Sequence, residues 1–161
     1  MTASPANTGI GRALARIPSG LFVLTAGVDE AATGILVSWV QQVGFTPPAL
    51  SVAIRKGRGI ETLIVQHGAF CITVLDEASK HLVGHFARGF EAGKPAFEDV
   101  PTAVSAVGVP YPTGTAAHLA CKLLGVADLS DHALYVGSVV EGGAGLHKEP
   151  LVHTRKNGFS Y

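Results

Sequence analysis

The sequence has few charged residues. Only 15% of its 161 residues are Asp, Glu, Lys or Arg, and twelve basic residues balance twelve acidic ones. In a typical soluble domain about a quarter of the residues are charged. Because no basic excess is available to neutralise a phosphate backbone, the composition argues against nucleic acid as the main partner. Any anionic ligand must be small and be met by a local group of basic residues.

Long apolar runs are also missing. None approaches the ~20 residues that a membrane helix needs, and residues 1–20 lack the apolar core of a signal peptide. Cys71 and Cys121 lie inside strand-like runs, FCITVL and LACKLL, which predicts small reduced core residues. We therefore expect a cytoplasmic protein without a membrane contact, formed as one domain over residues 1–161.

Common catalytic motifs are absent or incomplete. No G-x-S-x-G elbow occurs and both cysteines lack a basic setting, so nucleophilic catalysis is not expected. The GIGRAL segment (9–14) has no preceding strand, which favours a helix start over a dinucleotide-binding fingerprint. His81 and His85 share a helical face, but HLVGH contains no glutamate and no third ligand is evident. We expect no metal site.

Apolar runs and turn residues predict a mainly β protein. Twenty glycines and the low charge suit closely packed strands joined by tight turns, and they leave apolar surface for a second subunit to cover. Proline at 47 and 48 ends a long buried strand, because proline cannot donate to a ladder. We predict strands over residues 21–27, 34–45, 49–55, 70–75, 118–129, 132–143 and 151–155.

Helices are expected only as short additions. Apolar spacing predicts helices over residues 10–17, 60–68 and 76–88, the last with Asp76 as its N-cap. Residues 89–117 are rich in Gly, Pro and Ala and predict a long loop with one short strand. Strands that do not alternate with long helices favour a closed β-barrel with helical additions over a doubly wound parallel sheet.

A basic segment, Arg55-Lys56-Gly57-Arg58, follows one predicted strand and precedes a predicted helix. A bare basic triplet is most often a solvated turn. At this position, however, its charges and the N–H groups of the helix N-terminus could together hold a phosphate.

The stretch TGILVSWVQQVGFTPPALSVAIRKGR resembles the first half of the flavin reductase-like family, the FMN-binding split barrels. The similarity continues from about Arg12 to the last residue, and the SWVQQ form with its closing segment resembles the flavoredoxin and diflavin-protein branch. It implies a Greek-key split barrel with short flanking helices. The matching segments downstream are HGAFCITVL (67–75), HLVGHFARGF (81–90), HLACKLL (118–124), SDHALYVGSVVEGG (130–143) and LVHTRKNGFSY (151–161).

The resemblance also implies a set of ligand contacts. Residues 34–40 would lie along the flavin ring, Ala53 would leave room for the ring or the ribityl chain, and the basic segment would hold the phosphate. His132 corresponds to a position on the nicotinamide side and is the expected catalytic residue. The implied cofactor-binding residues are Gly34, Leu36, Val37, Ser38, Trp39, Val40, Ala53, Lys56, Arg58, Phe86 and Arg88.

Three functions follow from the resemblance. The first is an FMN-dependent NAD(P)H:flavin oxidoreductase, with FMN favoured over FAD, acting as a homodimer and in some settings as the reductase component of a monooxygenase. The second is an FMN electron carrier reduced by another redox protein. The third is a split barrel that binds another small ligand. Thr73, Gly44 and Ser130 depart from residues common in the family, which leaves the reductant open.

Overall fold

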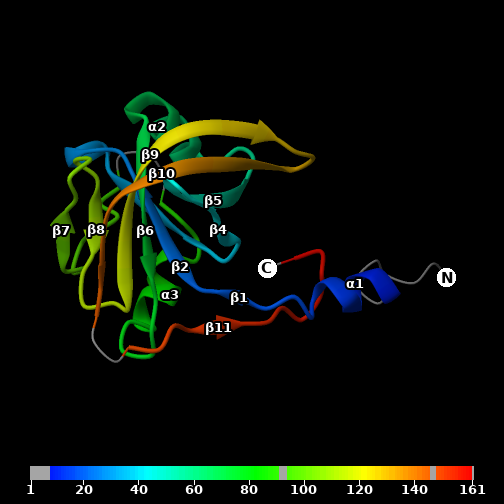
Figure 1. Cartoon of the computed structure of the whole chain (residues 1–161). Helices are drawn as coiled ribbons and strands as arrows, with labels where there is room; N and C mark the ends of the chain where they lie inside the picture. The colour runs from blue at the N-terminus through cyan, green and yellow to red at the C-terminus, as the bar shows by residue number, and fades with distance from the viewer. Residues whose placement is uncertain (1–7, 91–93, 146–147, 161) are drawn as a thin grey trace.

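The computed structural model describes residues 8–90, 94–145 and 148–160. A seven-stranded sheet runs in the order β3-β2-β6-β9-β10-β5-β4, and every neighbouring pair is antiparallel (Figure 1). The mainly β fold predicted from the sequence is confirmed. The strands are β2 (Phe22–Ala26), β3 (Thr33–Val37), β4 (Val40–Phe45), β5 (Pro48–Arg55), β6 (Ala69–Val74), β9 (Ala117–Asp128) and β10 (His132–Ala144).

The two ends of this sheet are consecutive in the chain. Only Ser38 and Trp39 separate β3 from β4. Three Cα steps span at most about 11 Å, so the end of β3 lies close to the start of β4 and the sheet must curl round on itself. The predicted single strand over 34–45 is therefore wrong: the chain passes there from one end of the sheet to the other. The Trp39 carbonyl accepts a hydrogen bond from Ala53 N at 3.0 Å, which fastens the crossing to β5.

The inside of the curled sheet holds the main core. Leu24, Val52, Phe70 and Ile72 are fully buried there. Helix α2 (Gly59–His67) adds Ile60 and Ile64 to the same core and ends at Gly68, whose φ of 67° is the left-handed conformation that glycine favours. This helix agrees with its prediction.

Shorter elements cover the outer face of β2, β6 and β9. Helix α3 (His81–Phe86) brings Leu82 and Phe86 against Val23, and the hairpin of β7 (Thr102–Val104) and β8 (Pro110–Pro112) packs nearby. The predicted helix over 76–88 is thus too long. Asp76 forms a β-bridge with Pro150, and its carboxylate accepts a hydrogen bond from Ser79 N at 2.8 Å. A bend and a turn follow over residues 77–80, so the N-cap of α3 is Lys80 and not Asp76 as predicted.

Both cysteines are buried and free, as predicted. Burial raises the pKa of the Cys71 thiol to about 11 and that of Cys121 to about 12, so neither supplies a thiolate near neutral pH.

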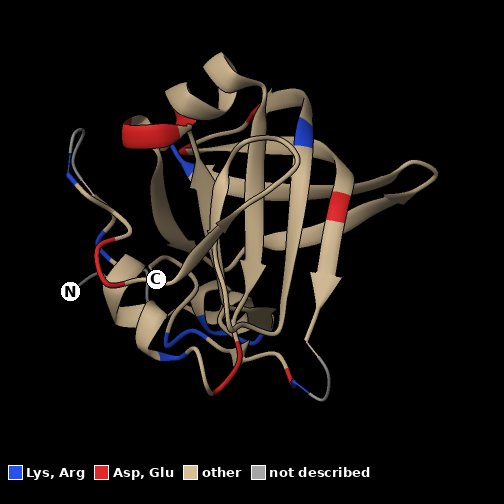
Figure 2. Cartoon of the chain, turned by 90° about the vertical axis from the view of Figure 1, so that its left-hand side faces the viewer, with Lys and Arg blue, Asp and Glu red and all other residues tan. Residues whose placement is uncertain are grey.

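The chain ends form a separate ribbon beside the sheet. Strand β1 (Ser19–Gly20) pairs with β11 (Val152–His153), and helix α1 (Gly9–Leu14) lies at the far end of that ribbon (Figure 1). The strand predicted over 151–155 is reduced to two residues. Charged residues gather mainly at strand ends and in loops (Figure 2), and among the described residues no helix is long and apolar enough to cross a membrane.

Candidate functional site

Two adjoining cavities lie where the sheet ends meet. They have volumes of about 400 Å³ and about 460 Å³ and share Ala53 and Arg55 as lining residues. We call them the first and the second cavity. The first is lined by Leu21, Ile35, Leu36, Val37, Ser38, Ala53, Ile54, Arg55, Arg58, Val83, Ala87, Gly89 and His153. The second is lined by Trp39, Ala53, Arg55, Leu129, Ser130, Asp131, His132, Arg155, Gly158, Phe159 and Ser160.

The first cavity combines apolar walls with a basic end. Strands β3 and β5 supply most of the aliphatic lining, and Val83 of α3 adds to it. Arg55 and Arg58 come from the end of β5 and the start of α2. Both guanidinium-bearing residues are exposed, so a ligand phosphate could reach them from solvent. A flat, mostly apolar molecule with one anionic group matches this lining.

The Ser38 hydroxyl is the clearest sign of a ligand in the first cavity. Ser38 is only 7% exposed and lines the cavity, yet its Oγ has no hydrogen-bond partner in the described part of the chain. A buried hydroxyl without a partner costs about 1–3 kcal/mol, which a polar atom of a bound molecule would recover. The residues present therefore fit a flavin, whose ring carries polar edges.

At the N-terminus of helix α2, the backbone N–H of Arg58 is already hydrogen-bonded within the protein. Arg58 N donates to Glu61 Oε2 at 2.8 Å, and Tyr135 Oη donates to Glu61 Oε1 at 3.1 Å. This carboxylate occupies part of the position that the sequence suggested for a phosphate. The basic side chains, and not the N-cap N–H, are left to bind an anion in the first cavity.

The second cavity holds an aromatic and imidazole pair. The Trp39 and His132 rings lie 4.8 Å apart at 39°, and the Arg155 guanidinium lies 5.0 Å from the Trp39 ring centre. His132 Nδ1 is 2.8 Å from Asp131 Oδ1. The hydrogen bond from His132 lowers the pKa of the Asp131 carboxyl. An ionised carboxylate only accepts hydrogen bonds, so His132 Nδ1 carries the proton of this hydrogen bond.

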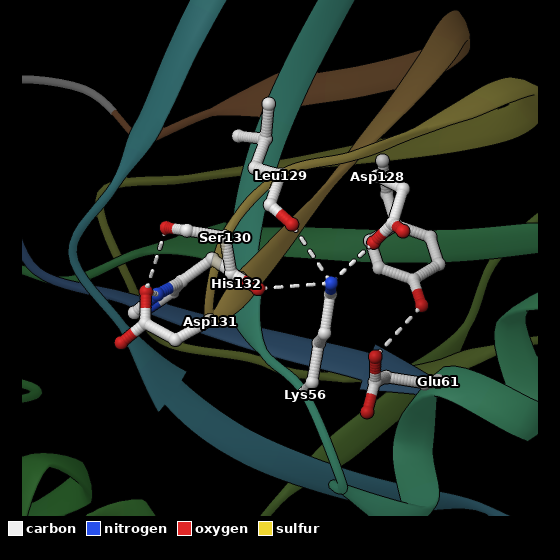
Figure 3. Close-up of polar contacts among 8 residues, drawn as sticks. Lys56, Glu61, Asp128, Leu129, Ser130, Asp131 and His132 are labelled. Carbon is white, nitrogen blue, oxygen red and sulfur yellow. Dashed lines mark hydrogen bonds and ion pairs between the residues drawn. The ribbon is translucent and has the colours of Figure 1, made fainter.

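Lys56 departs from its predicted role. Its ammonium donates to the carbonyl oxygens of Leu129 at 2.8 Å and Ser130 at 3.0 Å, and it forms an ion pair with Asp128 (Figure 3). Lys56 lines neither cavity. Although it adjoins Arg55 in sequence, its side chain holds the turn that precedes His132.

The other predicted contacts divide between the cavities and the protein interior. Leu36, Val37, Ser38, Ala53 and Arg58 line the first cavity, and Trp39, Ala53 and His132 line the second. Neither lining includes Gly34, Val40, Phe86 or Arg88. A Cβ at Gly34 would lie 2.8 Å from the Phe86 ring, and Phe86 is fully buried, so both belong to core packing. Val40 pairs with Val52 in the sheet, and Arg88 is exposed.

Sequence reasoning missed two lining arginines. Arg55 belongs to the basic segment but was not selected, although it lines both cavities. Arg155 lies in the closing segment and reaches the second cavity only because the ribbon of chain ends folds back there. Among the described residues no group of three or more His, Cys, Asp or Glu is placed to hold a metal ion, and His85 Nε2 lies 2.8 Å from the Ala96 carbonyl.

Comparison with known proteins gives a consistent result. The model of the flavin reductase like domain family matches residues 14–160. A relative, the putative diflavin flavoprotein A 6 of a Nostoc species, is 36% identical over 99% of this chain, but the chain covers only 28% of that relative. The chain thus spans roughly a quarter of the length of such curated relatives.

Solved structures share the fold. The NADH:FAD oxidoreductase SgcE6 of Streptomyces globisporus superposes with a TM-score of 0.83 at 22% identity, covering 89% of this chain and 86% of that one. The styrene monooxygenase flavin reductase of Pseudomonas putida superposes with a TM-score of 0.77 at 25% identity, covering 91% of this chain and 93% of that one.

Proposed function

The chain belongs to the flavin reductase-like family, and from that membership we propose that this domain is an FMN-dependent NAD(P)H:flavin oxidoreductase. The observation that carries the proposal is the pair of cavities that meet at Ala53 and Arg55. A two-ligand reaction needs two sites whose occupants touch, because reacting atoms must approach within about 3.5 Å. The small side chain of Ala53 at the junction leaves room for that approach.

The flavin site is the first cavity. Leu36 and Val37 would pack against the ring, Ser38 Oγ would bond to one of its polar atoms, and Arg58 with Arg55 would bind the terminal phosphate. When bound, the flavin supplies the hydride-accepting position, its N5, so the protein needs no nucleophile or carboxylate pair of its own. A basic end matched to one terminal phosphate favours FMN over FAD.

The reductant site is the second cavity. His132, held by Asp131, would present its ring to the nicotinamide side, and Trp39 offers an aromatic surface beside it. The contribution of these residues is orientation and the exclusion of water, not proton transfer. His132 is the residue to which we assign this positioning.

A homodimer is part of the proposal. Strands β9 and β10 project beyond the body of the sheet as a long arm (Figure 1), and that arm exposes large apolar side chains. Leu124 is 61% exposed and Leu129 51%, and Phe45 on the β4–β5 turn is 88% exposed. Burial of such side chains against a second subunit would remove an unfavourable contact with water.

An FMN electron carrier is the second candidate. It is favoured by the length comparison, because relatives roughly four times longer hold this domain beside other segments that could supply or take electrons. In that case a redox partner, and not a nicotinamide, would reduce the flavin. If the protein is a reductase, its partner would instead be a separate monooxygenase that takes up the reduced flavin.

One experiment separates the two candidates. The purified protein is mixed anaerobically with FMN and then with NADH or NADPH, while the visible flavin band is recorded. Rapid bleaching would support the reductase and identify the reductant. A bound flavin that neither nucleotide reduces would contradict the reductase and favour the carrier. Failure to bind FMN would contradict both.

A further inference from the structure

The described residues that line the second cavity include two arginines whose side chains form no ion pair with a described carboxylate. Arg55 and Arg155 both line it, and in residues 8–90, 94–145 and 148–160 neither forms an ion pair with Asp or Glu. Two like charges that face one cavity repel each other unless an anion lies between them. The cavity is therefore arranged for a ligand with negative charge.

Arg155 is held in place without losing its charge. Nη1 donates to the Gly158 carbonyl at 3.3 Å and Nη2 to the Leu14 carbonyl at 3.1 Å. The guanidinium also lies over the Trp39 ring, which fixes its plane further. A guanidinium has five N–H donors, so these two bonds leave others for a ligand. An oriented arginine of this kind suits a phosphate, which it can contact through two parallel bonds.

The acid in the second cavity does not cancel this charge. Asp131 lines the same cavity, but its Oδ1 accepts hydrogen bonds from His132 Nδ1 at 2.8 Å and from Ser130 Oγ at 3.3 Å. Its carboxylate is directed to the turn of which it is part. Among the described side chains that line the second cavity, one carboxylate stands against two guanidinium groups, so their summed charge is positive.

The three arginines of the site divide between the cavities. Arg58 lines the first cavity only, Arg155 the second only, and Arg55 both. Ligands that occupy the two cavities would therefore share one arginine and each have one of its own. This arrangement gives a distinct test for each ligand.

We propose that Arg155, together with Arg55, binds the diphosphate of a nicotinamide dinucleotide, while its nicotinamide ring extends toward Ala53 and His132. The assignment rests on the reductase function proposed above, and it adds that the reductant is recognised through its diphosphate. Reduced nicotinamides without phosphate would lose this contact. The site thereby selects a dinucleotide over a smaller hydride donor.

Binding of ADP-ribose tests the proposal without any redox step, because ADP-ribose carries the diphosphate and lacks nicotinamide. Calorimetric titration of the FMN-loaded protein should show that Arg155→Met and Arg55→Met each weaken ADP-ribose binding about tenfold to a hundredfold. Arg58→Met is the matched control and should weaken FMN binding while leaving ADP-ribose affinity unchanged. Equal ADP-ribose affinity in wild type and in Arg55→Met would overturn the proposal.

Arg55→Met keeps the proposal testable if Arg155→Met fails to fold. The Arg55 side chain is exposed and forms no hydrogen bond or ion pair with the described residues, while its backbone pairing in β5 does not depend on the side chain, so this variant should fold normally even if Arg155→Met loosens the C-terminal tail. Arg155→Lys, which keeps the charge but not the fork, should retain part of the affinity. An Arg155→Lys variant as weak as Arg155→Met, in a folded protein, would assign the effect to geometry and not to charge alone.

Kinetics with two donors give the second readout. At saturating FMN, Arg155→Met should lower kcat/KM for NADH or NADPH about tenfold or more, and should lower that for 1-benzyl-1,4-dihydronicotinamide, which has no phosphate, by a much smaller factor. Equal losses with both donors would overturn the proposal. If no nicotinamide reduces the flavin but arginine-dependent ADP-ribose binding persists, the reductase function fails while the diphosphate site stands.

Discussion

The ammonium nitrogen of Lys56 lies 2.8 Å from the carbonyl oxygen of Leu129, although these two residues are far apart in the chain. The same nitrogen also donates to Ser130 O (Figure 3), and the backbone N–H of Lys56 donates to the Asp131 carbonyl at 3.0 Å. The end of β5 is thereby fastened to the turn between β9 and β10. His132 begins β10 directly after this turn, so Lys56 fixes the position from which the His132 ring enters the second cavity.

Lys56→Met should therefore disturb His132 and not the flavin. The lost bonds are partly exposed, so we expect a loss of stability of about 1 kcal/mol and a change of FMN affinity below about twofold. Flavin reduction by the nicotinamide should slow, and Lys56→Arg should restore part of the rate. FMN titration and stopped-flow reduction measure the two effects. A large loss of FMN affinity, comparable with that in Arg58→Met, would instead indicate that Lys56 binds the FMN phosphate.

Ser38→Ala should have opposite effects on the free and the liganded protein. Removal of a buried hydroxyl without a partner should leave the stability of the ligand-free protein equal or slightly higher. FMN binding should weaken by about 1 kcal/mol, or about fivefold in Kd, because the hydroxyl bonds only to the ligand. Thermal unfolding and FMN titration provide the two numbers.

Thr25→Val is the matched control for Ser38→Ala. Thr25 also has a buried hydroxyl without a partner in the described chain, but it lines neither cavity. Its replacement should leave FMN affinity unchanged. Equal effects of both variants on FMN binding would assign the Ser38 effect to general packing.

His132→Ala should leave FMN bound and slow its reduction about tenfold or more, because the nicotinamide ring loses a neighbour that orients it. Asp131→Asn should produce a smaller loss, since the amide can still contact the ring but no longer fixes its tautomer as the carboxylate does. Single-turnover reduction with preloaded FMN separates this step from binding. Release of FMN without a slower reduction would contradict the placement of His132.

Acid stability should depend on Asp76. Burial raises the pKa of this carboxyl, but the hydrogen bonds from Ser79 and the Lys148 ammonium outweigh burial and lower it overall. A carboxyl whose folded pKa lies below its unfolded value of about 3.9 stabilises the fold above that pH, and the contribution disappears as pH falls through the folded pKa. Stability should therefore decrease below about pH 4.

Lys148→Met tests this dependence. Lys148 Nζ lies 3.5 Å from Asp76 Oδ2, so the variant should be less stable near neutral pH, and the difference from wild type should shrink as Asp76 is protonated. Urea unfolding between about pH 7 and pH 3 measures both curves. Lys80→Met, which removes an exposed pair with Glu77, is the control and should have little effect at either pH. A constant difference for Lys148→Met at all pH values would contradict the linkage.

The sequence predicted which segments form strands and helices better than it predicted where those segments begin and end. Apolar alternation and turn residues located β2, β5, β6, β9, β10 and helix α2, but they merged β3 and β4 into one strand. They could not reveal the break at Ser38 and Trp39, because the residues around it read as one continuous apolar run. The break exists because β3 and β4 belong to opposite ends of the sheet, which is a property of the whole fold.

The same limit applies to individual side chains. Lys56, Gly57 and Arg58 are adjacent in the basic segment, yet the two basic side chains serve different structures, since the chain turns between strand and helix and sends them apart. Arg155 lines the second cavity because β1 pairs with β11 and because its guanidinium hydrogen-bonds to Leu14 O. Neither interaction has a local sequence signal. Residues contributed by distant segments require the structure.

The two-residue link between β3 and β4 couples ligand binding to the closure of the sheet. Ser38 lines the first cavity and Trp39 the second, so each residue of this link contributes to the wall of a different ligand site. Those walls exist only when the sheet ends have come together, and a ligand in either cavity would hold them in that arrangement. Flavin affinity should thus measure how completely the sheet has curled, and a residue inserted between Ser38 and Trp39 would separate the two ligands at the same time as it loosens the barrel.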